Sequence, residues 1–368
     1  MRLQPGGGFF RPESRPSRDL GVLLARQLGA VGPLRVLDAM AGCGIRALRY
    51  GMEAGAEAVW ANDADPERLP LLQANLAPLA AATCGVRLSS RTAEQLLADC
   101  LLRRQRFELV DLDAFGAPTA LLPLALEAVT IGGVLYLAST DGRSPTGHDR
   151  RAALRSLGAA ARAHPASWEL ALRLQLGTLA RAAWAQGRGI EPLLSFSEGR
   201  TFRTAIRLRR GLAAGEECCL GLLAHCHGCG EQLVQSLLTL RRWSPCACPA
   251  GTAPPLAVSG PLWIGPLQHP ATLAALSAEA AGMPPGWLDR PGARLLAALL
   301  ADPGEPARCW PLAAIARRLG GGPPRLADLV AVLRGEGFQA CASGVRAGEL
   351  RSDAPWTVIL RHAAALTR

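Results

Sequence analysis

The chain has 368 residues, of which 49% are apolar and 19% charged, so it can bury a sizeable core, and disorder throughout its length is excluded. Its 40 basic and 30 acidic side chains give a formal net charge of +10, and every basic one is Arg. This excess favours a polyanionic partner such as nucleic acid, but taken alone it is a weak indication.

No part of the sequence has the pattern of a membrane segment. No apolar run is long enough to cross a bilayer, and the first residues, MRLQPGGGFF, lack the apolar stretch of a signal peptide. We therefore expect a cytoplasmic protein with no membrane partner, and no obligate protein partner is evident. In that compartment the 11 Cys are expected as thiols or metal ligands, not as disulfides.

Strands alternate with helices over the first part of the chain. The expected strands cover residues 34–37 and 58–61, followed by a third strand and helix in the segment VRLSSRTAEQLLADCLL, a strand that starts at Phe107 and one that ends near Ser139. This alternation is typical of an α/β fold with a parallel, doubly wound, Rossmann-like sheet. We place the domain at residues 1–210. Ligands of such sheets bind beyond the carboxyl ends of the strands.

A polar residue follows each of these strands closely. The five are Asp38, Asp63, Thr92, Asp113 and Asp141. A single acidic residue at a strand end is more often a helix cap than a site residue. Five polar residues at the same edge of one sheet favour a binding site at that edge.

The turn after the first strand, DAMAGCG, carries Gly42 and Gly44 but lacks the third glycine of a dinucleotide fingerprint. A carboxylate at Asp63 can accept both ribose hydroxyls of an adenosine, which fits NAD and S-adenosylmethionine alike. Asp38, just before the turn, would repel a pyrophosphate but attract an ammonium or sulfonium. We therefore favour S-adenosylmethionine as the cofactor.

The fourth strand ends in an acid and an aromatic residue, in the segment FELVDLDAFGAP. Asp113 and the carbonyl of Ala114 can accept the two N–H groups of a base amine, and Phe115 can stack on the base. The amine nitrogen is then held in line with a methyl donor. Two rival hypotheses are a nicotinamide-dependent oxidoreductase and a non-catalytic RNA-binding protein on a methyltransferase scaffold.

Several segments resemble the tRNA (guanine-N2)-dimethyltransferase family. VDLDAFGAP is similar to its V-D-L-D-P-F-G-S-P motif, RPSRDLGV to its N-R-D-L-S-V stretch, and AGCGIRALRYGMEAG to its G-I-R-x-x-R-Y-x-x-E block. GGFFRP, GRGIEPLLSFSEGRTFRTAIRL, SGPLWIGPL and LRSDAPW resemble further parts of that family. The matches run in order from Phe9 to Trp356.

The resemblance implies a class I S-adenosylmethionine-dependent methyltransferase that modifies guanine N2 at the D-arm/anticodon-arm junction of tRNA, at position 26, with position 27 left open. It implies that Asp113 is catalytic and that Phe115 and either Phe9 or Phe10 sandwich the guanine. It also implies a set of cofactor contacts from Arg18, Arg46, Asp63, Thr92 and Ala93.

The sequence departs from the family motifs at a few positions. Ala114 stands where the family has Pro, which loosens the turn but keeps the backbone carbonyl. Thr92 stands where an Asp is expected near the adenine amino group, and its hydroxyl can still accept a hydrogen bond. We interpret the chain as a divergent enzyme, because Asp113 and Asp63 are present.

Four cysteines in two pairs indicate a zinc module. Cys226 and Cys229 form a C-x-x-C pair, and Cys246 and Cys248 a tighter C-x-C pair. Four thiolates suit tetrahedral, structural Zn²⁺. The irregular second pair leaves open that His227 replaces one thiol, or that all four cysteines are free.

The last part of the chain is expected to form a smaller α+β domain over residues 211–368 that binds tRNA. The zinc module covers about 218–265, and three helices with a hairpin form a winged-helix-like part at about 290–356. Several arginines are candidates for phosphate contacts. They are Arg200, Arg203, Arg207, Arg317, Arg318, Arg334, Arg346 and Arg351.

Overall fold

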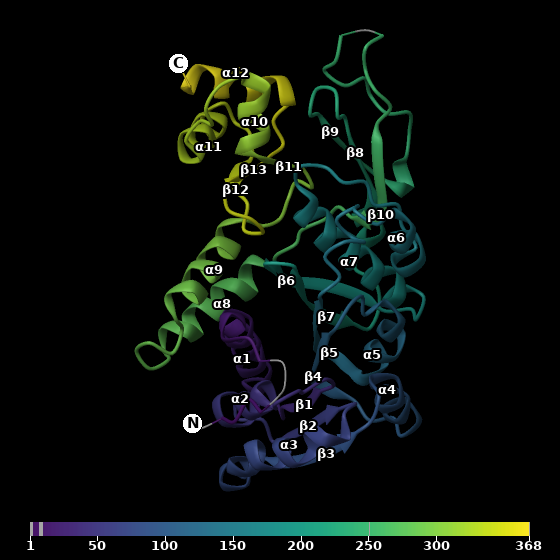
Figure 1. The fold of residues 1–368 in the computed structure, drawn as a ribbon, viewed down its shortest axis with the longest axis vertical. Helices are drawn as coiled ribbons and strands as arrows, with labels where there is room; N and C mark the ends of the chain where they lie inside the picture. The colour runs from purple at the N-terminus through teal and green to yellow at the C-terminus, as the bar shows by residue number, and fades with distance from the viewer. Residues whose placement is uncertain (1–2, 7–9, 250, 368) are drawn as a thin grey trace.

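The computed structural model describes residues 3–6, 10–249 and 251–367, and its main element is a seven-stranded sheet with the strand order β3-β2-β1-β4-β5-β7-β6 (Figure 1). The strands are β1 (Arg35–Asp38), β2 (Ala58–Asp63), β3 (Gly85–Ser90), β4 (Phe107–Ala114), β5 (Val129–Ser139), β6 (Gly189–Glu198) and β7 (Thr201–Arg209). The first five are parallel, as the sequence predicts. The sequence did not predict that β7 would pair antiparallel with β5 and β6.

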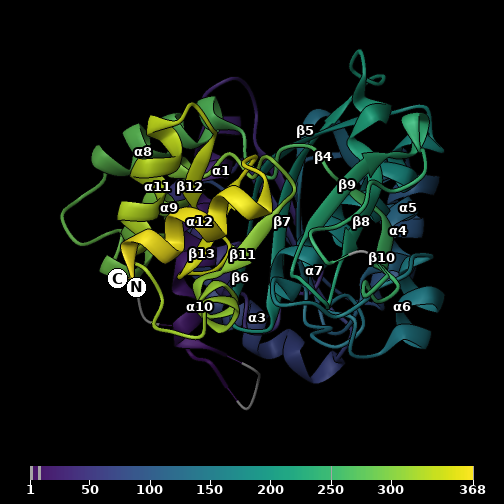
Figure 2. The ribbon, with the colours of Figure 1, turned by 90° about the horizontal axis from the view of Figure 1, so that it is seen from above.

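Helices cover both faces of this sheet (Figure 2). One face carries α1 (Arg15–Gly29), α2 (Ile45–Ala54) and α3 (Leu69–Leu76), and the other carries α4 (Ala93–Leu102), α5 (Leu122–Ala128) and α7 (Ser167–Trp184). Successive residues of a strand point to opposite faces, so Leu109 packs on the α1 side and Val110 on the α7 side. Strands buried on both faces explain the continuous apolar runs in the sequence.

Residues beyond β7 form two smaller sheets and a helix pair. The first sheet holds β8 (Leu220–His225), β9 (Gln232–Ser236) and β10 (Ala257–Trp263), in the order β10-β8-β9. The helices α8 (Pro270–Ala281) and α9 (Arg290–Ala301) share a core with α1. The domain boundary near residue 210 stays a prediction, because these two helices lie beyond it and yet pack on the first domain.

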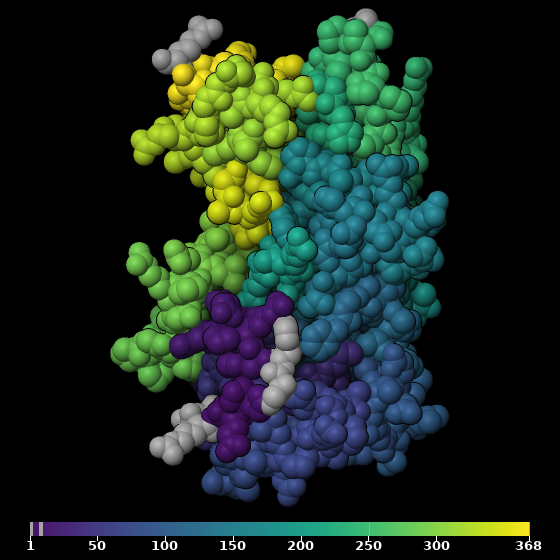
Figure 3. Space-filling view, in the orientation of Figure 1, coloured from purple at the N-terminus to yellow at the C-terminus, as the bar shows by residue number. Residues whose placement is uncertain are grey.

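The C-terminal module has a core of its own. Its elements are β11 (Cys309–Pro311), α10 (Leu312–Leu319), α11 (Leu326–Gly335), β12 (Ala340–Ala342), β13 (Glu349–Ser352) and α12 (Trp356–Leu366). The helices α9, α10 and α11 and the strands β12 and β13 follow the order of three helices and a hairpin that the sequence predicts. The strand β11 and the helix α12 were not predicted. The outline of the molecule is notched between this module and the α8–α9 pair (Figure 3).

A buried ionic cluster fastens the C-terminal module to α7. Arg351 on β13 donates to Glu169 on α7 and to Asp302, with N–O distances of 2.6 Å to each. Burial favours a neutral Glu169, but Arg351 and Arg173 outweigh it and lower the pKa of that carboxyl to about 2. The proposed phosphate contact of Arg351 is wrong, because its side chain is completely buried.

Among the described helices, none is both long and apolar enough to cross a membrane.

Candidate active site

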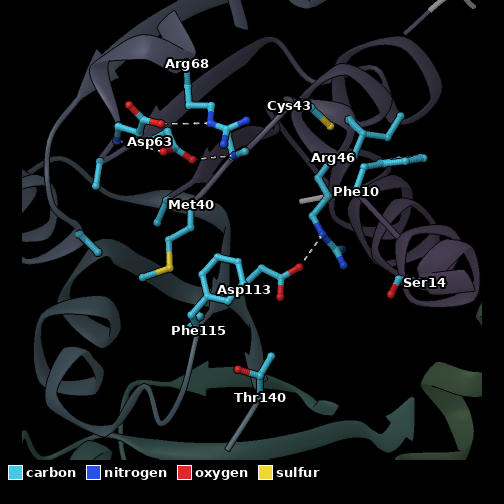
Figure 4. A pocket seen from close by; sticks show the side chains of 18 of the residues that line it. Phe10, Ser14, Met40, Cys43, Arg46, Asp63, Arg68, Asp113, Phe115 and Thr140 are labelled. Atoms are coloured by element: carbon cyan, nitrogen blue, oxygen red, sulfur yellow. Dashed lines mark hydrogen bonds and ion pairs between the residues drawn. The ribbon is translucent and has the colours of Figure 1, made fainter. Parts of the chain in front are cut away.

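A cavity of about 500 Å³ opens beyond the carboxyl ends of β1, β2 and β4 (Figure 4). Its walls come from the glycine turn after β1, the end of β2, the start of α4, the end of β4 and the segment before α1. Of the five polar strand-end residues expected at one edge, Asp63, Thr92 and Asp113 line it. Asp38 and Asp141 do not.

The glycine turn and Asp63 form one end of the cavity. The backbone N–H of Gly42 donates to Asp63 Oδ2 at 2.9 Å, which fixes the carboxylate against the turn. Gly42 has a φ of 55°, and an added Cβ would meet nothing within 4 Å, so this position leaves open space for a ligand. Gly44, which also has a positive φ, precedes the first residue of α2. It does not line the cavity, so its predicted contact with the cofactor stays a prediction.

Asp38 differs from its predicted role. Its side chain is completely buried, and Oδ2 accepts the backbone N–H of Ala47 in α2. Burial, followed by the charge of Asp111, raises its pKa well above the ordinary value. The carboxyl therefore lies behind the cavity wall, where it cannot contact a cofactor, and its local role is to accept a hydrogen bond from the helix.

Thr92 and Ala93 lie at the start of α4 and line the cavity. The hydroxyl of Thr92 accepts the N–H of Gln95, and the Gln95 side chain accepts the N–H of Thr92, a reciprocal capping box. Threonine thus keeps the helix start in place where the resemblance expects an Asp.

The segment before α1 forms the opposite wall. Arg18 lines the cavity, donates to the carbonyls of Arg11 and Pro12, and lies 5.1 Å from the centre of the Phe10 phenyl group. Burial, followed by the charges of Arg46 and Arg49, lowers the pKa of Arg18 to about 10. Of the two aromatic candidates in this segment, Phe10 lines the cavity and Phe9 lies outside the described residues.

Asp113, at the end of β4, is held by two arginines. Arg46 Nε lies 3.2 Å and Arg203 Nη2 2.9 Å from its Oδ2. Oδ1 has no hydrogen-bond partner among the described residues. Burial would raise the pKa of Asp113, but the charges of Arg203 and Arg46 outweigh it and lower the pKa to about 2. The side chain is 30% exposed, and it is ionised at neutral pH.

Behind Asp113 lies a second, fully buried acid. Asp111 accepts from the hydroxyl of Tyr50 at 2.5 Å and from Arg46 at 3.3 Å. The third nitrogen of Arg46 donates to the Ser17 hydroxyl. Arg46 lines the cavity as expected, but each of its nitrogens faces a protein oxygen.

The turn after β4 presents an aromatic side chain beside Asp113. Phe115 is 73% exposed at the cavity rim, whereas Ala114 is buried in its wall. Three hydrogen bonds hold the turn to the end of β5. Gly116 N donates to Thr140 Oγ1, and the Gly116 carbonyl accepts from Thr140 N and from the Ser139 hydroxyl. In Figure 4, Asp113, Phe115 and Met40 lie close together around the opening.

The four predicted metal cysteines come together. Their sulfur atoms all lie within 4.8 Å of one another, and Cys226 and Cys248 are 3.6 Å apart. Four sulfurs at 2.3 Å from one ion would be about 3.8 Å apart, so the group fits tetrahedral Zn²⁺ despite the tight C-x-C pair. His227 is exposed and is not part of the group.

Two residues of the site were not identified from the sequence. Arg203 on β7 was proposed as a phosphate contact, but its side chain is buried beneath Asp113. Glu198 at the end of β6 accepts from Arg203 and from the backbone N–H of Ser17. The only signal for either is their place in the segment SFSEGRTFR, within a block that resembles the family.

The strand order, with one antiparallel strand inserted beside β5, and a cavity bounded by a glycine turn and a β2 carboxylate define a class I methyltransferase fold of the S-adenosylmethionine-dependent type. The profile of the N2,N2-dimethylguanosine tRNA methyltransferase family matches residues 4–363. The chain belongs to this family.

Similar proteins cover nearly the whole chain. The tRNA (guanine(26)-N(2))-dimethyltransferase of Methanosphaerula palustris is 30% identical over 95% of this chain and 90% of its own length. That of Methanocorpusculum labreanum is 29% identical over 94% and 88%. The solved complex of Trm1 from Pyrococcus horikoshii with S-adenosyl-L-methionine has a TM-score of 0.84 and 25% identity, and covers 99% of this chain and 95% of that one.

Proposed function

We propose that this chain transfers methyl groups from S-adenosylmethionine to the exocyclic N2 of guanine 26 in tRNA, giving N2-methyl- and N2,N2-dimethylguanosine. Its family and the names of its relatives support this reaction. The observation that carries the proposal is the ionised Asp113 beside exposed Phe115 at the mouth of a cavity whose far end holds Asp63.

The cavity residues fit the cofactor. Asp63 offers carboxylate oxygens to ribose hydroxyls, Gly42 leaves room for close approach, and Thr92 with Ala93 borders the space for an adenine. Arg18 supplies a positive charge for the methionine carboxylate. When bound, S-adenosylmethionine supplies an activated methyl group on a positively charged sulfur. Metal at the cysteine group would be structural, since no step of the reaction needs it.

Asp113 acts on the acceptor base. In the first transfer, Oδ1 and the Ala114 carbonyl accept the two N–H groups of guanine N2 and so orient the nitrogen lone pair. In the second transfer, one of these two oxygens accepts the single remaining N–H. Phe115 from one side and Phe10 from the other hold the purine after it leaves its stack. Asp113, Phe115 and Phe10 would thereby hold N2 for transfer of the methyl group that bound S-adenosylmethionine would supply, with its sulfur leaving as a neutral thioether.

The low pKa of Asp113, caused by Arg203 and Arg46, favours one of two roles for its carboxylate. A group with a pKa of about 2 is a poor proton acceptor at neutral pH, so it serves to orient the amine and to stabilise charge that develops on N2. The proton leaves N2 for water after the methyl group has arrived, when the nitrogen is strongly acidic.

A basic groove supports tRNA docking outside the cavity. It has a volume of about 370 Å³ along β9 and includes Arg241, Arg242 and Arg308, with Trp243 beside them and no acidic residue in its lining. Guanidinium groups pair with phosphates, and an indole can stack on an unpaired base. The exposed Arg317, Arg318, Arg334 and Arg346 remain candidates for further phosphate contacts. A cytoplasmic location stays a prediction.

Nucleoside analysis tests this function. Purified protein is incubated with methyl-labelled S-adenosylmethionine and unmodified tRNA, and the tRNA is then digested to nucleosides. We expect labelled N2-methylguanosine species from the native chain and none from Asp113→Asn, which keeps the shape of the side chain but not its charge. Native protein that binds tRNA and yields no labelled nucleoside would instead favour a non-catalytic RNA-binding protein. Binding of NADH without methyl transfer would favour an oxidoreductase.

A further inference from the structure

Asp113 belongs to a closed set of contacts that reaches five elements of the fold. Arg203 donates to Asp113 and, through Nε, to Glu198 at 3.3 Å. Glu198 accepts the backbone N–H of Ser17 at 3.0 Å. The Ser17 hydroxyl accepts from Arg46 at 3.3 Å, and Arg46 returns to Asp113 at 3.2 Å. We call these five residues the contact ring.

The contact ring joins the two sides of the candidate active site. Asp113 ends β4, next to the rim residue Phe115, whereas Ser17 lies in the first turn of α1, next to Arg18 on the opposite wall. Glu198 and Arg203 come from β6 and β7, which lie far from both walls in sequence. The two walls are thus joined by two routes, one through Arg46 and the other through Glu198 and Arg203.

Burial makes these contacts strong. The side chain of Arg203 is 3% exposed and that of Glu198 15%. Charged groups so far from water need their partners, and loss of one leaves the other uncompensated. Glu198 also accepts an N–H in the first turn of α1, where helix N–H groups have no partner within the helix and favour a negative charge.

We propose that Glu198 and Arg203 are positioning residues for methyl transfer: through the contact ring they fix Asp113 Oδ2, so that Oδ1 faces the base, and hold the N-terminal wall with Phe10 and Arg18 at the distance that the base requires. This inference rests on the proposed function. Neither residue contacts the reacting atoms. Their loss misplaces Asp113 relative to the opposite wall, and misplacement by about 1 Å can cost about a hundredfold in rate.

The same hairpin offers a matched control. Glu191 pairs with Arg207 at 2.7 Å, directly across β6 and β7, and also with Arg209. Glu198 and Arg203 form a diagonal pair across the same two strands, because Phe196 lies opposite Arg203. Glu191 lies at the other end of the hairpin and does not line the cavity. Glu191→Gln therefore removes the charge of a partly buried glutamate that faces Arg207 and Arg209 on β7, without touching the contact ring.

The test compares kcat, the KM for S-adenosylmethionine and the thermal unfolding midpoint of the full chain and its variants. For Glu198→Gln we expect kcat to fall about ten- to a hundredfold, with a smaller rise in the KM for S-adenosylmethionine because the wall that carries Arg18 shifts as well. Arg203→Gln should lose at least as much, and Arg203→Lys should recover part of it because it keeps the charge. Glu191→Gln should retain native kcat.

The outcomes separate the two proposals. A folded Glu198→Gln with the kcat of Glu191→Gln would overturn the role of the contact ring while leaving the methyltransferase function intact. A native chain that forms no N2-methylguanosine would overturn the proposed function itself, and the ring's role with it. If Arg203→Gln fails to fold, Glu198→Gln decides, because its amide can still accept the Ser17 N–H.

Discussion

Asp113 is the residue on which the chemistry depends, and its surroundings fix its charge. Arg46 on α2 and Arg203 on β7 face it as cations, Asp111 on β4 and Asp38 on β1 as acids. The two cations prevail and lower the pKa to about 2. A carboxylate whose pKa is lowered on folding stabilises the protein above its ordinary pKa and loses that contribution as the pH falls toward the lowered value.

This pKa predicts the pH dependence of methyl transfer. Asp113 stays ionised over the whole neutral range, and none of the described residues that line the cavity is a histidine. We therefore expect kcat to show no acid limb from the enzyme between about pH 5 and about pH 8. The pH profile should be measured with saturating tRNA and cofactor. An acid limb with a midpoint near neutral pH would contradict this prediction. It would mean that the pKa of Asp113 is much higher, or that another group controls the reaction.

Single residues differ in how well the sequence predicts them. Asp113, Phe115, Asp63 and Thr92 could be placed because each follows a strand, and the ends of parallel strands meet at one edge. Asp38 satisfies the same rule and is nevertheless buried, since the chain after β1 turns over it. No role could be assigned to Glu198 from the sequence, because its partners lie in α1 and on β7. A local sequence pattern does not predict an ion pair or hydrogen bond between distant segments.

Among the elements, the loop that carries Cys226 and Cys229 joins β8 to β9 and contacts the C-terminal module. Trp356 Nε1 donates to the Cys229 carbonyl, and Trp310 Nε1 to the carbonyl of Gly230. The two indoles stack, with centroids 5.3 Å apart. The two indoles therefore depend for their hydrogen bonds on the conformation of the cysteine loop.

Metal analysis tests the cysteine group. We expect about one zinc per chain in the native protein, and loss of zinc in Cys226→Ser and Cys248→Ser. Cys218→Ser is the matched control, because Cys218 is an exposed thiol outside the group. Zinc loss should also lower the unfolding midpoint and change tryptophan fluorescence, given the bonds from Trp310 and Trp356. Native protein without bound metal would contradict this assignment.

The ionic cluster between β13 and α7 predicts a large effect on stability. Arg351→Gln leaves Glu169 and Asp302 buried without their main partner, which should destabilise the protein by about 3–5 kcal/mol. Arg346→Gln changes an exposed arginine nearby and should alter stability by less than about 0.5 kcal/mol. Denaturant unfolding measures both. Equal stability of the two variants would show that the buried cluster does not hold the module.

Over the whole molecule, the basic surface predicts how tRNA binding depends on salt. Each phosphate contact releases counterions, so affinity should fall steeply as salt rises. Replacing Arg241 and Arg242 by Gln should weaken binding and reduce the slope of log affinity against log salt by about two. Arg103→Gln, an exposed change at the end of α4, should leave the slope unchanged. An unchanged slope in the double variant would place the docking surface away from β9.

The sequence predicted the whole-molecule arrangement only in part. Five parallel strands and, near the C-terminus, three helices with a hairpin follow from hydrophobic period and turn residues, which are local. The packing of α8 and α9 on α1 depends on apolar faces more than two hundred residues apart, which no local pattern pairs. The antiparallel position of β7 beside β5 likewise depends on how distant segments pair, which a local pattern does not predict. This pairing brings Arg203 beneath Asp113.

Site-specific methylation of defined tRNA tests the central claim most directly. Two transcripts of one tRNA, with guanine or adenine at position 26, are incubated with methyl-labelled S-adenosylmethionine and the native chain, and the label is located by mass spectrometry of nuclease fragments. The account predicts label on N2 of guanine 26 in the first transcript and none at position 26 in the second. Label on another atom of guanine 26, or no label in the first transcript, would contradict it.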